Sequence, residues 1–361
     1  MTDVQIQLFL ILVLLSIGYW LVPFKFRAIF IITITSIFLY YLSAITCVIL
    51  FIETLLSYYA ARQYTKRHNS QFIFIPIAML TIFFIIYQYY YQKYNLSLPL
   101  IIGFAYFTCR QIHYLIETYK NSITNIHFLN YLSYQFFLPA IFSGPIHRYQ
   151  NFSKQIQRAY ITKEDISLSI ERIIYGYFKV VVIANYFISF KIMPLITNKN
   201  IISLYAVSFL TWLFIYISFS GLTDIALGFS KLMGVKLEEN FNHPYKANSL
   251  IEFWERWHMT LTRWAKDYVF MPVFMTFRIK IFAVIFALIA IGFWHEVSLH
   301  YILWGLYQAI GVILCKTYTN TGDILNLKKL PHFYELTIKK TATFLWLLSF
   351  MPLYHLLGVY L

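Results

Sequence analysis

Charged residues are scarce in this chain. Asp, Glu, Lys and Arg together make up 12% of its 361 residues, whereas soluble globular domains contain roughly 25%. This scarcity argues against a soluble protein. The hydrophobic share of 60% indicates instead a chain that crosses a membrane several times.

Cysteine is scarcer still, with three residues in the whole chain. Cys47, Cys109 and Cys315 each lie in or beside an apolar stretch, and their spacing is not that of metal ligands. The sequence therefore argues against a disulfide framework and against a cysteine-based zinc site.

Acidic residues are few. The chain contains 15 Asp and Glu and 29 Lys and Arg, which gives a net charge of +14. In a soluble protein this excess would suggest nucleic-acid binding. Here the basic residues lie in short loops between apolar runs. The excess therefore predicts cytoplasmic loops and contact with anionic membrane lipid, with no nucleic-acid partner.

Long apolar runs are what the chain has in abundance. They predict an all-α, polytopic integral membrane protein with roughly nine to eleven transmembrane or re-entrant segments. We expect a single membrane-embedded domain over residues 1–361, because no internal repeat or linker is visible. The expected segments are Gln5–Val22, Ala28–Tyr59 as two helices, Phe72–Tyr91, Pro99–Tyr119, Phe128–Ile146, Ile173–Phe190, Tyr205–Phe219, Ile281–Trp294, Leu299–Cys315 and Thr343–Tyr360.

The expected span Pro99–Tyr119 is unusually polar. Arg110, His113 and Glu117 lie three or four residues apart, so a helix would align them in one stripe that faces the protein interior. Such a stripe either lines a cavity or packs helices together. Further on, the turn around Gly144 is typical of a re-entrant segment.

The stretch Ile251–Phe270 is predicted to form one amphipathic helix that lies in the membrane interface or tilts into the protein. Between it and the preceding apolar run, residues 220–248 form a mixed, polar segment. One face of the predicted helix would contain Trp254, Trp257, His258, Leu261, Ala265 and Tyr268.

Two histidines follow tryptophans, His258 after Trp257 and His295 after Trp294. Ionisable side chains at membrane depth are costly and are functional-site candidates by default. His295 is the stronger candidate, since an imidazole can accept a proton from an attacking hydroxyl near neutral pH. For both residues the alternative is a hydrogen-bonded structural histidine.

A metal site at His295 must also be weighed, because His295-Glu296 resembles the start of a zinc-protease helix. The next histidine is His300, five residues on, where that motif requires four. Five residues turn a helix by about 500°, which places the two rings on different faces. We therefore expect no metal ion.

Two charged residues outside these pairs are further candidates. Asp224 lies amid apolar residues and could orient a histidine or bind substrate; a helix cap or a structural ion pair is the alternative. Arg148, shortly after the turn at Gly144, could hold an acidic donor group or anchor the chain at the lipid headgroups.

Taken in order, these motifs resemble the signature of the membrane-bound O-acyltransferases, in the branch of alginate O-acetyltransferase and teichoic acid D-alanyltransferase. The resemblance extends from about Leu98 to Gln308. Its motifs are Leu98-Pro99-Leu100, Ser143-Gly144-Pro145 with Arg148-Tyr149, Phe219-Ser220-Gly221 with Asp224 and Gly228, Asn240-Phe241-Asn242-His243-Pro244-Tyr245, Phe253-Trp254-Glu255-Arg256-Trp257-His258-Met259-Thr260-Leu261-Thr262, Asp267-Tyr268 and Trp294-His295 before Leu303-Trp304-Gly305-Leu306.

The resemblance implies helices around a central funnel, with His295 as the catalytic residue and His258 as the second family histidine. It also implies residues that line the funnel or bind substrate, namely Trp294, Glu296, Asp224, Asn240, Arg256, Asp267 and Arg148. Glu296 departs from this branch, which usually has glycine there, and we hypothesise that it raises the basicity of His295.

The function implied is transfer of an acyl group, most readily acetyl, to hydroxyls of a cell-envelope polysaccharide or of a partner protein. The donor would be a cytoplasmic thioester, either acetyl-CoA or an acyl carrier protein, used as a co-substrate with no bound cofactor. The implied partner is a secreted or membrane-anchored esterase-like acyltransferase, and the implied location is the inner, cytoplasmic membrane. D-alanyl transfer to teichoic acid, a glycan-precursor transporter and a non-catalytic scaffold are the alternatives.

Overall fold

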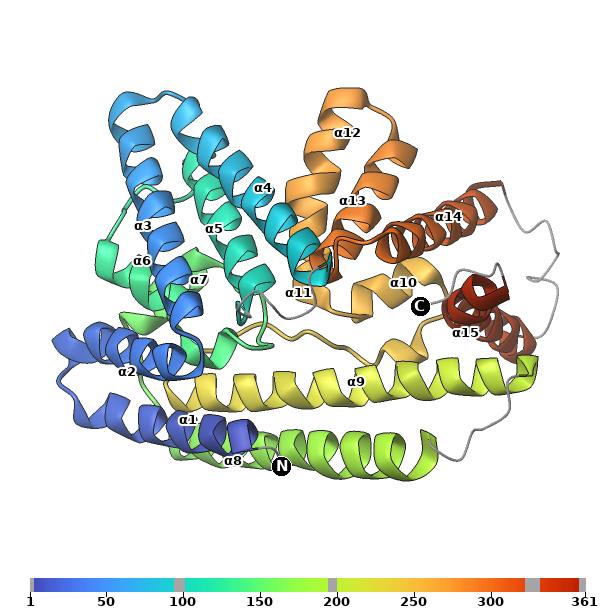
Figure 1. The fold of residues 1–361 in the computed structure, drawn as a ribbon, viewed down its shortest axis with the longest axis horizontal. Coiled ribbons are helices and arrows are strands. Elements are labelled where there is room, and N and C mark those ends of the chain that lie inside the picture. Colours follow the sequence, from blue (N-terminus) through green and yellow to red (C-terminus); the bar gives the residue numbers. More distant parts are fainter. Residues whose placement is uncertain (1–2, 94–100, 194–199, 322–331, 357–361) are drawn as a thin grey trace. The chain divides into compact units, whose positions relative to one another are not determined.

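The computed structural model describes residues 3–93, 101–193, 200–321 and 332–356 (Figure 1). All secondary structure in these residues is helical, and no strand occurs among them. The prediction of an all-α protein is therefore confirmed.

The chain forms two compact units from interleaved segments. Unit 1 comprises Met1–Gly176 and Leu222–Glu238, and unit 2 comprises Tyr177–Gly221 and Glu239–Leu361. The single domain expected over residues 1–361 stays a prediction.

The helices follow the chain in this order: α1 Asp3–Leu21, α2 Arg27–Leu42, α3 Ala44–Arg67, α4 Gln71–Lys93, α5 Phe104–Tyr119, α6 Phe128–Gln135, α7 Tyr149–Ile156, α8 Lys163–Tyr177, α9 Ile201–Leu232, α10 Leu250–Arg256, α11 Met259–Ala265, α12 Met271–Phe277, α13 Lys280–His295, α14 Leu299–Thr321 and α15 His332–Leu356. Short 3-10 turns occur at η1 Phe24–Phe26, η2 Leu138–Ala140 and η5 Pro244–Lys246. Wider π-type turns form η3 Phe178–Ile192, which continues α8, and η6 Lys266–Phe270.

Six helical stretches of the described chain are long and apolar enough to cross a membrane, which makes this a multi-pass membrane protein. They are Phe24–Leu42, Ala44–Arg67, Gln71–Lys93, Lys163–Ile192, Ile201–Leu232 and Leu299–Thr317. Two shorter apolar helices, Ile6–Leu21 and Lys280–His295, accompany them. The number is below the expected nine to eleven, because several expected segments form shorter or more polar helices.

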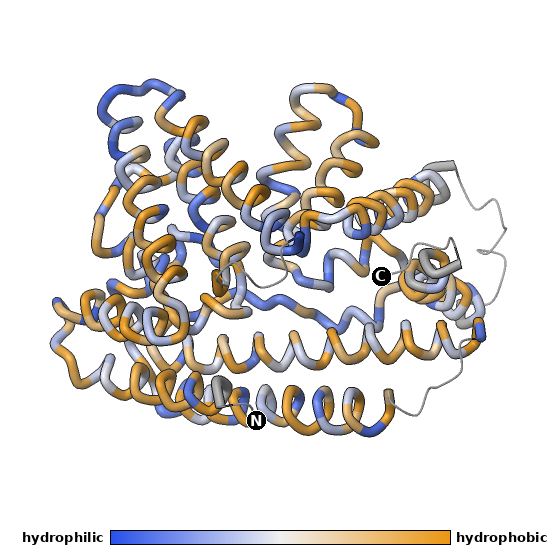
Figure 2. The backbone as a smooth tube through the Cα atoms, viewed as in Figure 1, coloured by the Kyte–Doolittle hydropathy of each residue, from blue (hydrophilic) through white to orange (hydrophobic). Residues whose placement is uncertain are grey.

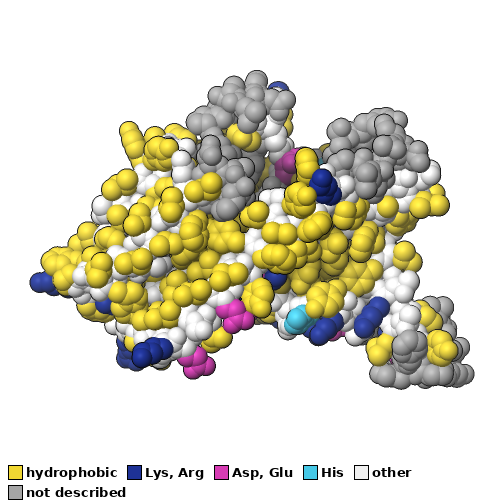
Figure 3. All heavy atoms as spheres, turned by 90° about the horizontal axis from the view of Figure 1, so that it is seen from below, with side chains coloured by type: hydrophobic (Ala, Val, Ile, Leu, Met, Phe, Trp, Pro, Cys, Tyr) yellow, Lys and Arg dark blue, Asp and Glu magenta, His cyan; other side chains and the backbone are white. Residues whose placement is uncertain are grey.

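The surfaces of these helices are apolar. Figure 2 shows α1 and α9 as mostly hydrophobic, and Figure 3 shows hydrophobic side chains over much of the face that it draws. Large side chains such as Leu14, Ile82 and Ile202 are exposed on them. Side chains of this kind are stable when they face lipid instead of water.

The expected division of Ala28–Tyr59 into two helices is confirmed. The backbone of Ser43 is extended between α2 and α3, and its hydroxyl accepts a hydrogen bond from the amide of Thr46 at 3.3 Å. This is the usual N-cap arrangement, which satisfies an amide at the start of a new helix.

Helix α9 corrects the expected polar segment that begins at residue 220, since it continues without a break to Leu232. Ser220 fits within the helix because its hydroxyl donates to the carbonyl of Ile217 at 3.2 Å. The helix ends at Leu232, and Gly234 shortly after it has a positive φ of 74°, which suits the left-handed turn that commonly terminates helices.

Candidate active site

A break between two short helices of unit 2 positions His258. Helix α10 ends at Arg256 and α11 begins at Met259, and between them His258 has left-handed backbone angles of φ 41° and ψ 53°. The continuous amphipathic helix expected over Ile251–Phe270 is therefore wrong. The break takes His258 off the face that it was expected to share with Trp254, because a left-handed residue cannot continue a right-handed helix.

The segment 240–242 supports this break on both sides. The carbonyl of Asn240 accepts from the amide of Met259 at 2.8 Å, and its side-chain oxygen accepts from the hydroxyl of Thr260 at 2.6 Å. The amide of Asn242 donates to the carbonyl of Arg256 at 3.0 Å. Asn240 is fully buried, so these bonds fix the backbone around His258 in a water-poor interior.

Arg256 forms part of the same support. Its guanidinium pairs with Glu252 at 2.9 Å and donates to the carbonyl of Asn242 at 3.1 Å. Ser249 caps α10, since its hydroxyl accepts from the amide of Glu252 at 3.1 Å. The structure thus places Arg256 among contacts that hold the turn.

His295 is the last residue of α13, which packs closely against α14. A Cβ at Gly292 would lie 2.4 Å from the carbonyl oxygen of Tyr301, and one at Gly305 would lie 2.8 Å from that of Leu288. Only glycine permits this approach of the two backbones. Glu296 then turns into extended backbone, and its amide closes α13 on the carbonyl of Gly292 at 3.1 Å.

Aromatic side chains join the two histidines. The ring of Trp294 lies 5.1 Å from that of His258 and 4.7 Å from that of His295, between ring centroids. Phe219 contacts His258 at 4.7 Å. The two histidines, 37 positions apart in the numbering, thus both contact one tryptophan within unit 2.

The face of His295 is covered by α14. Tyr301 stacks on the imidazole at 5.6 Å with an interplanar angle of 20°, and Trp304 meets it edge-on at 5.8 Å. We refer to Phe219, Trp294, Tyr301 and Trp304 as the aromatic cluster. Trp254, a neighbour of Trp304 at 5.8 Å, extends it.

Burial separates the two imidazoles in a way that the sequence did not predict. His258 is 2% exposed, whereas the side chain of His295 is accessible. The place of His295 at the last residue of α13 leaves its ring open on one side. An accessible imidazole can meet a substrate directly.

Two acidic candidates also lie in unit 2. Glu296 acts electrostatically on His300 and Tyr301, and its role toward His295 stays a hypothesis. Asp267 is half-buried in the π-type turn η6 that follows α11.

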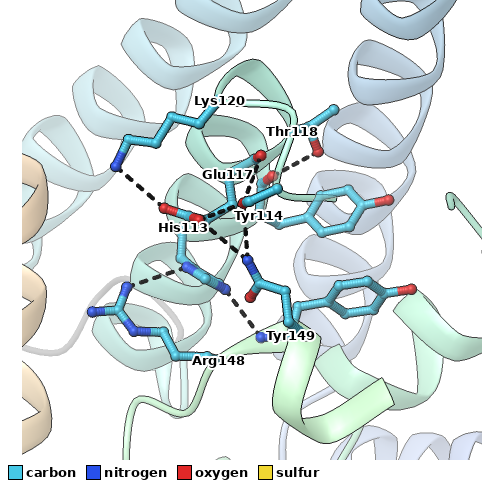
Figure 4. Close-up of polar contacts among 9 residues, drawn as sticks. His113, Tyr114, Glu117, Thr118, Lys120, Arg148 and Tyr149 are labelled. Atoms are coloured by element: carbon cyan, nitrogen blue, oxygen red, sulfur yellow. Dashed lines mark hydrogen bonds and ion pairs between the residues drawn. The ribbon is translucent and has the colours of Figure 1, made fainter. Parts of the chain in front are cut away.

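Two other candidates belong to unit 1. Asp224, on α9, accepts a hydrogen bond from the Nε of Arg172 at 2.9 Å and so forms an ion pair. Arg148 points its guanidinium toward His113 of α5 (Figure 4), with 3.3 Å between Nη1 and Nδ1. The Nε2 of His113 accepts from the amide of Tyr149 at 3.0 Å.

The polar stripe on α5 holds the irregular chain that follows α6. Arg110, fully buried, donates to the carbonyls of Tyr134 at 3.0 Å and Gln135 at 3.2 Å. Glu117 accepts from the side chain of Gln150 at 3.2 Å. Each member of the stripe thus binds the segment 134–150, which makes the stripe a packing device for backbone that lacks helical hydrogen bonds.

Tyr301 escaped the sequence analysis, because it contacts His295 without a distinctive motif of its own. Phe219 and Thr260 lie within motifs of the resemblance, but their contacts with His258 and Asn240 were not predicted. The available signal was the glycine pair Gly292 and Gly305, whose place on successive apolar helices indicates a close helix hairpin after His295.

The arrangement suits proton transfer beside apolar side chains. An accessible imidazole can accept a proton from a hydroxyl, and aromatic walls keep the surroundings apolar. Within the described part of the chain, His, Cys, Asp and Glu form no group of three that could hold a metal ion. Fold and site together define a multi-pass helical membrane protein with a histidine-centred site.

Comparison with known proteins identifies its family. The model of the membrane-bound O-acyltransferase family matches residues 100–350. The chain therefore belongs to the membrane-bound O-acyltransferase family, as the sequence motifs indicated.

Named relatives fall into two groups. The chain is 32% identical over 276 residues to a peptidoglycan O-acetyltransferase of Helicobacter pylori, covering 67% of this chain and 52% of that protein. It is 27% identical over 301 residues to a teichoic acid D-alanyltransferase of Streptococcus thermophilus, covering 76% and 72%. A probable alginate O-acetylase of Pseudomonas aeruginosa is 27% identical over 222 residues, covering 58% and 41%. The match thus spans about half of the first relative.

Proposed function

We propose that this protein is an integral-membrane O-acyltransferase that transfers an acetyl group to hydroxyls of a cell-envelope polysaccharide. The single observation that carries the proposal is the accessible imidazole of His295 within the aromatic cluster, next to Trp294 and the buried His258. Family membership and the relatives named as O-acetyltransferases support it.

In the proposed reaction, His295 accepts the proton of the acceptor hydroxyl while that oxygen attacks the thioester carbonyl. The new C–O bond forms, the C–S bond breaks, and the proton passes from the imidazole to the departing thiolate. The cytoplasmic donor would be acetyl-CoA or an acyl carrier protein. His258 would position Trp294 and hence His295, since it contacts Trp294 directly.

The remaining proposals concern partners and location. We place the protein in the inner, cytoplasmic membrane, in contact with membrane lipid and with a secreted or membrane-anchored esterase-like partner. Glu296, Asp267, Asn240 and Arg256 are proposed to line or support the path of the substrates in unit 2. Asp224 and Arg148 are proposed to bind substrate in unit 1. For Asn240 and Arg256 the contacts at the α10–α11 turn favour support.

D-alanyl transfer to teichoic acid is the second candidate. One observation favours it: the match to the D-alanyltransferase of Streptococcus thermophilus covers more of both chains than the match to the peptidoglycan O-acetyltransferase does. The two candidates differ in the acid released when the modified polymer is hydrolysed, which is D-alanine in one case and acetate in the other.

The test is the acyl content of the envelope polymers in cells that carry His295→Ala, compared with wild type and with a deletion strain at equal protein level. Loss of a general base costs about 10²–10⁴-fold in rate. We therefore expect the acyl content of His295→Ala cells to be as low as that of the deletion strain. Wild-type acylation in His295→Ala cells would overturn the proposal and favour a transporter or a scaffold.

A further inference from the structure

Unit 1 contains a cavity with a strongly basic lining. Its volume is about 310 Å³, and the residues around it include Lys154, Arg158, Lys231, Lys236 and a single acid, Asp165. They come from α7, the turn after it, the start of α8 and the end of α9. Four cations around one cavity make it suited to an anion.

The walls of this basic cavity are fixed by hydrogen bonds. The side chain of Gln155 accepts from the amide of Lys236 at 2.7 Å and donates to its carbonyl at 3.1 Å. Gly234 lies against Tyr160, where a Cβ would be 3.0 Å from the carbonyl oxygen of that residue. The two segments that contribute the cations are thus held together before any ligand binds.

The single acid is already engaged. Asp165 pairs with Lys231 at 3.2 Å and accepts from the hydroxyl of Thr162 at 2.8 Å. Lys154, Arg158 and Lys236 have exposed side chains, and no acid pairs with them among the described residues. The cavity therefore presents about three uncompensated positive charges, which favours a multiply charged anion over a single carboxylate.

We propose that the basic cavity binds the phosphate groups of an anionic ligand. Arg158 offers a planar fork for two phosphate oxygens, and the lysines add point charges. A volume of about 310 Å³ is at the lower end for small-molecule sites, so it accommodates a phosphorylated head group. Such a group belongs to coenzyme A, the donor class on which the proposed function depends, and equally to an anionic lipid.

The test measures binding to the full chain, purified in detergent. Coenzyme A is titrated into wild type, into Lys154→Gln/Arg158→Gln, and into the control Lys66→Gln/Arg67→Gln. The control removes the same two charge types from exposed positions of unit 1 at the end of α3. Because the cavity variant loses two charged hydrogen-bond donors, we expect it to bind coenzyme A about tenfold or more weakly than wild type.

Inorganic phosphate should compete with coenzyme A in wild type, whereas pantetheine without phosphate should not. The lipid source is tested in nanodiscs with phosphatidylglycerol against phosphatidylcholine. Selective binding of phosphatidylglycerol alone, weakened by the cavity variant, would support the phosphate site and assign it to lipid. Equal binding by the cavity and control variants for both ligands would overturn the proposal.

These outcomes are separable from those for the proposed function. His295→Ala should bind coenzyme A as wild type does while losing acyl transfer, because His295 lies in unit 2, outside the basic cavity. Loss of acyl transfer with unchanged binding of coenzyme A therefore tests the proposed role of His295. Loss of coenzyme A binding in the cavity variant, in which His295 is unchanged, tests the proposed phosphate site in the basic cavity.

Discussion

At the scale of single residues, His258 combines a buried ring with a left-handed backbone. Non-glycine residues pay roughly 1–2 kcal/mol for this conformation, and Asn tolerates it better than most. The structure retains it here because Asn240 and Asn242 bind the backbone on both sides. The position therefore constrains both the side chain and the backbone.

We expect His258→Asn to leave the fold more stable than His258→Val, although Val is the more apolar residue. A β-branched side chain strains left-handed backbone, which should lower the melting temperature of the purified protein in detergent. Acyl transfer should fall in both variants, since both lose the ring that contacts Trp294. If His258→Val were the more stable variant, the cost of burying a polar side chain would outweigh the backbone strain in setting the stability at this position.

The hydrogen bond between Thr260 and Asn240 permits a second prediction. Thr260→Val removes the 2.6 Å bond at nearly constant volume, and loss of a buried hydrogen bond costs about 1–3 kcal/mol. Thr262→Val is the matched control, because the hydroxyl of Thr262 donates to the carbonyl of Trp257 at 3.2 Å from a half-buried position. Denaturation should show a clear loss for Thr260→Val and a smaller one for Thr262→Val; equal losses would contradict the role of Asn240.

At the scale of elements, the pairing of α13 with α14 determines where His295 lies. The two helices touch through the backbone at Gly292 and Gly305, and this contact brings Tyr301 onto the imidazole. A change in their separation would therefore alter the surroundings of His295 without touching the residue itself.

We expect Gly292→Ala to lower both stability and acyl transfer. The new Cβ would collide with the backbone of Tyr301, and overpacking of this kind costs about 1–3 kcal/mol. Gly18→Ala is the control, since its Cβ would meet only the end of the Phe30 side chain, which can move aside. Wild-type transfer by Gly292→Ala would show that the hairpin tolerates separation.

The elements also show how far the sequence could be used for prediction. Apolar runs predicted α1, α4 and two helices within Ala28–Tyr59, because membrane spans depend on composition alone; the place of the division, Ser43, was not predicted. The break at His258 could not be predicted, since the segment has helical periodicity throughout. It arises from hydrogen bonds to residues 240–242, which lie distant in sequence. The aromatic cluster was missed for the same reason, although the Trp-His pairs at its centre were found.

At the scale of the whole molecule, the apolar surface indicates that the described helices are surrounded by lipid and not by water. Helix α4 has a mean hydropathy of 2.1 over its most apolar window, and Ile82 on it is 56% exposed. In a soluble protein such a position would accept a charge at little cost.

Ile82→Arg should therefore impair membrane insertion, because an arginine at the centre of a spanning helix costs roughly 2.5–3.5 kcal/mol. Gln71→Arg, at the exposed first residue of α4, should be tolerated. The measurement is the amount of each variant in the membrane fraction and its melting temperature in detergent. If Ile82→Arg accumulates as wild type does, α4 does not face lipid at that residue.

The interleaved order of the two units has a consequence for biogenesis. Unit 1 needs Leu222–Glu238, yet the ribosome makes all of Tyr177–Gly221, which belongs to unit 2, before that segment emerges. Domains generally fold as units during synthesis, N-terminal parts first. Unit 1 must therefore wait, with the C-terminal part of α9 and the segment after it missing, while part of unit 2 has already been synthesised.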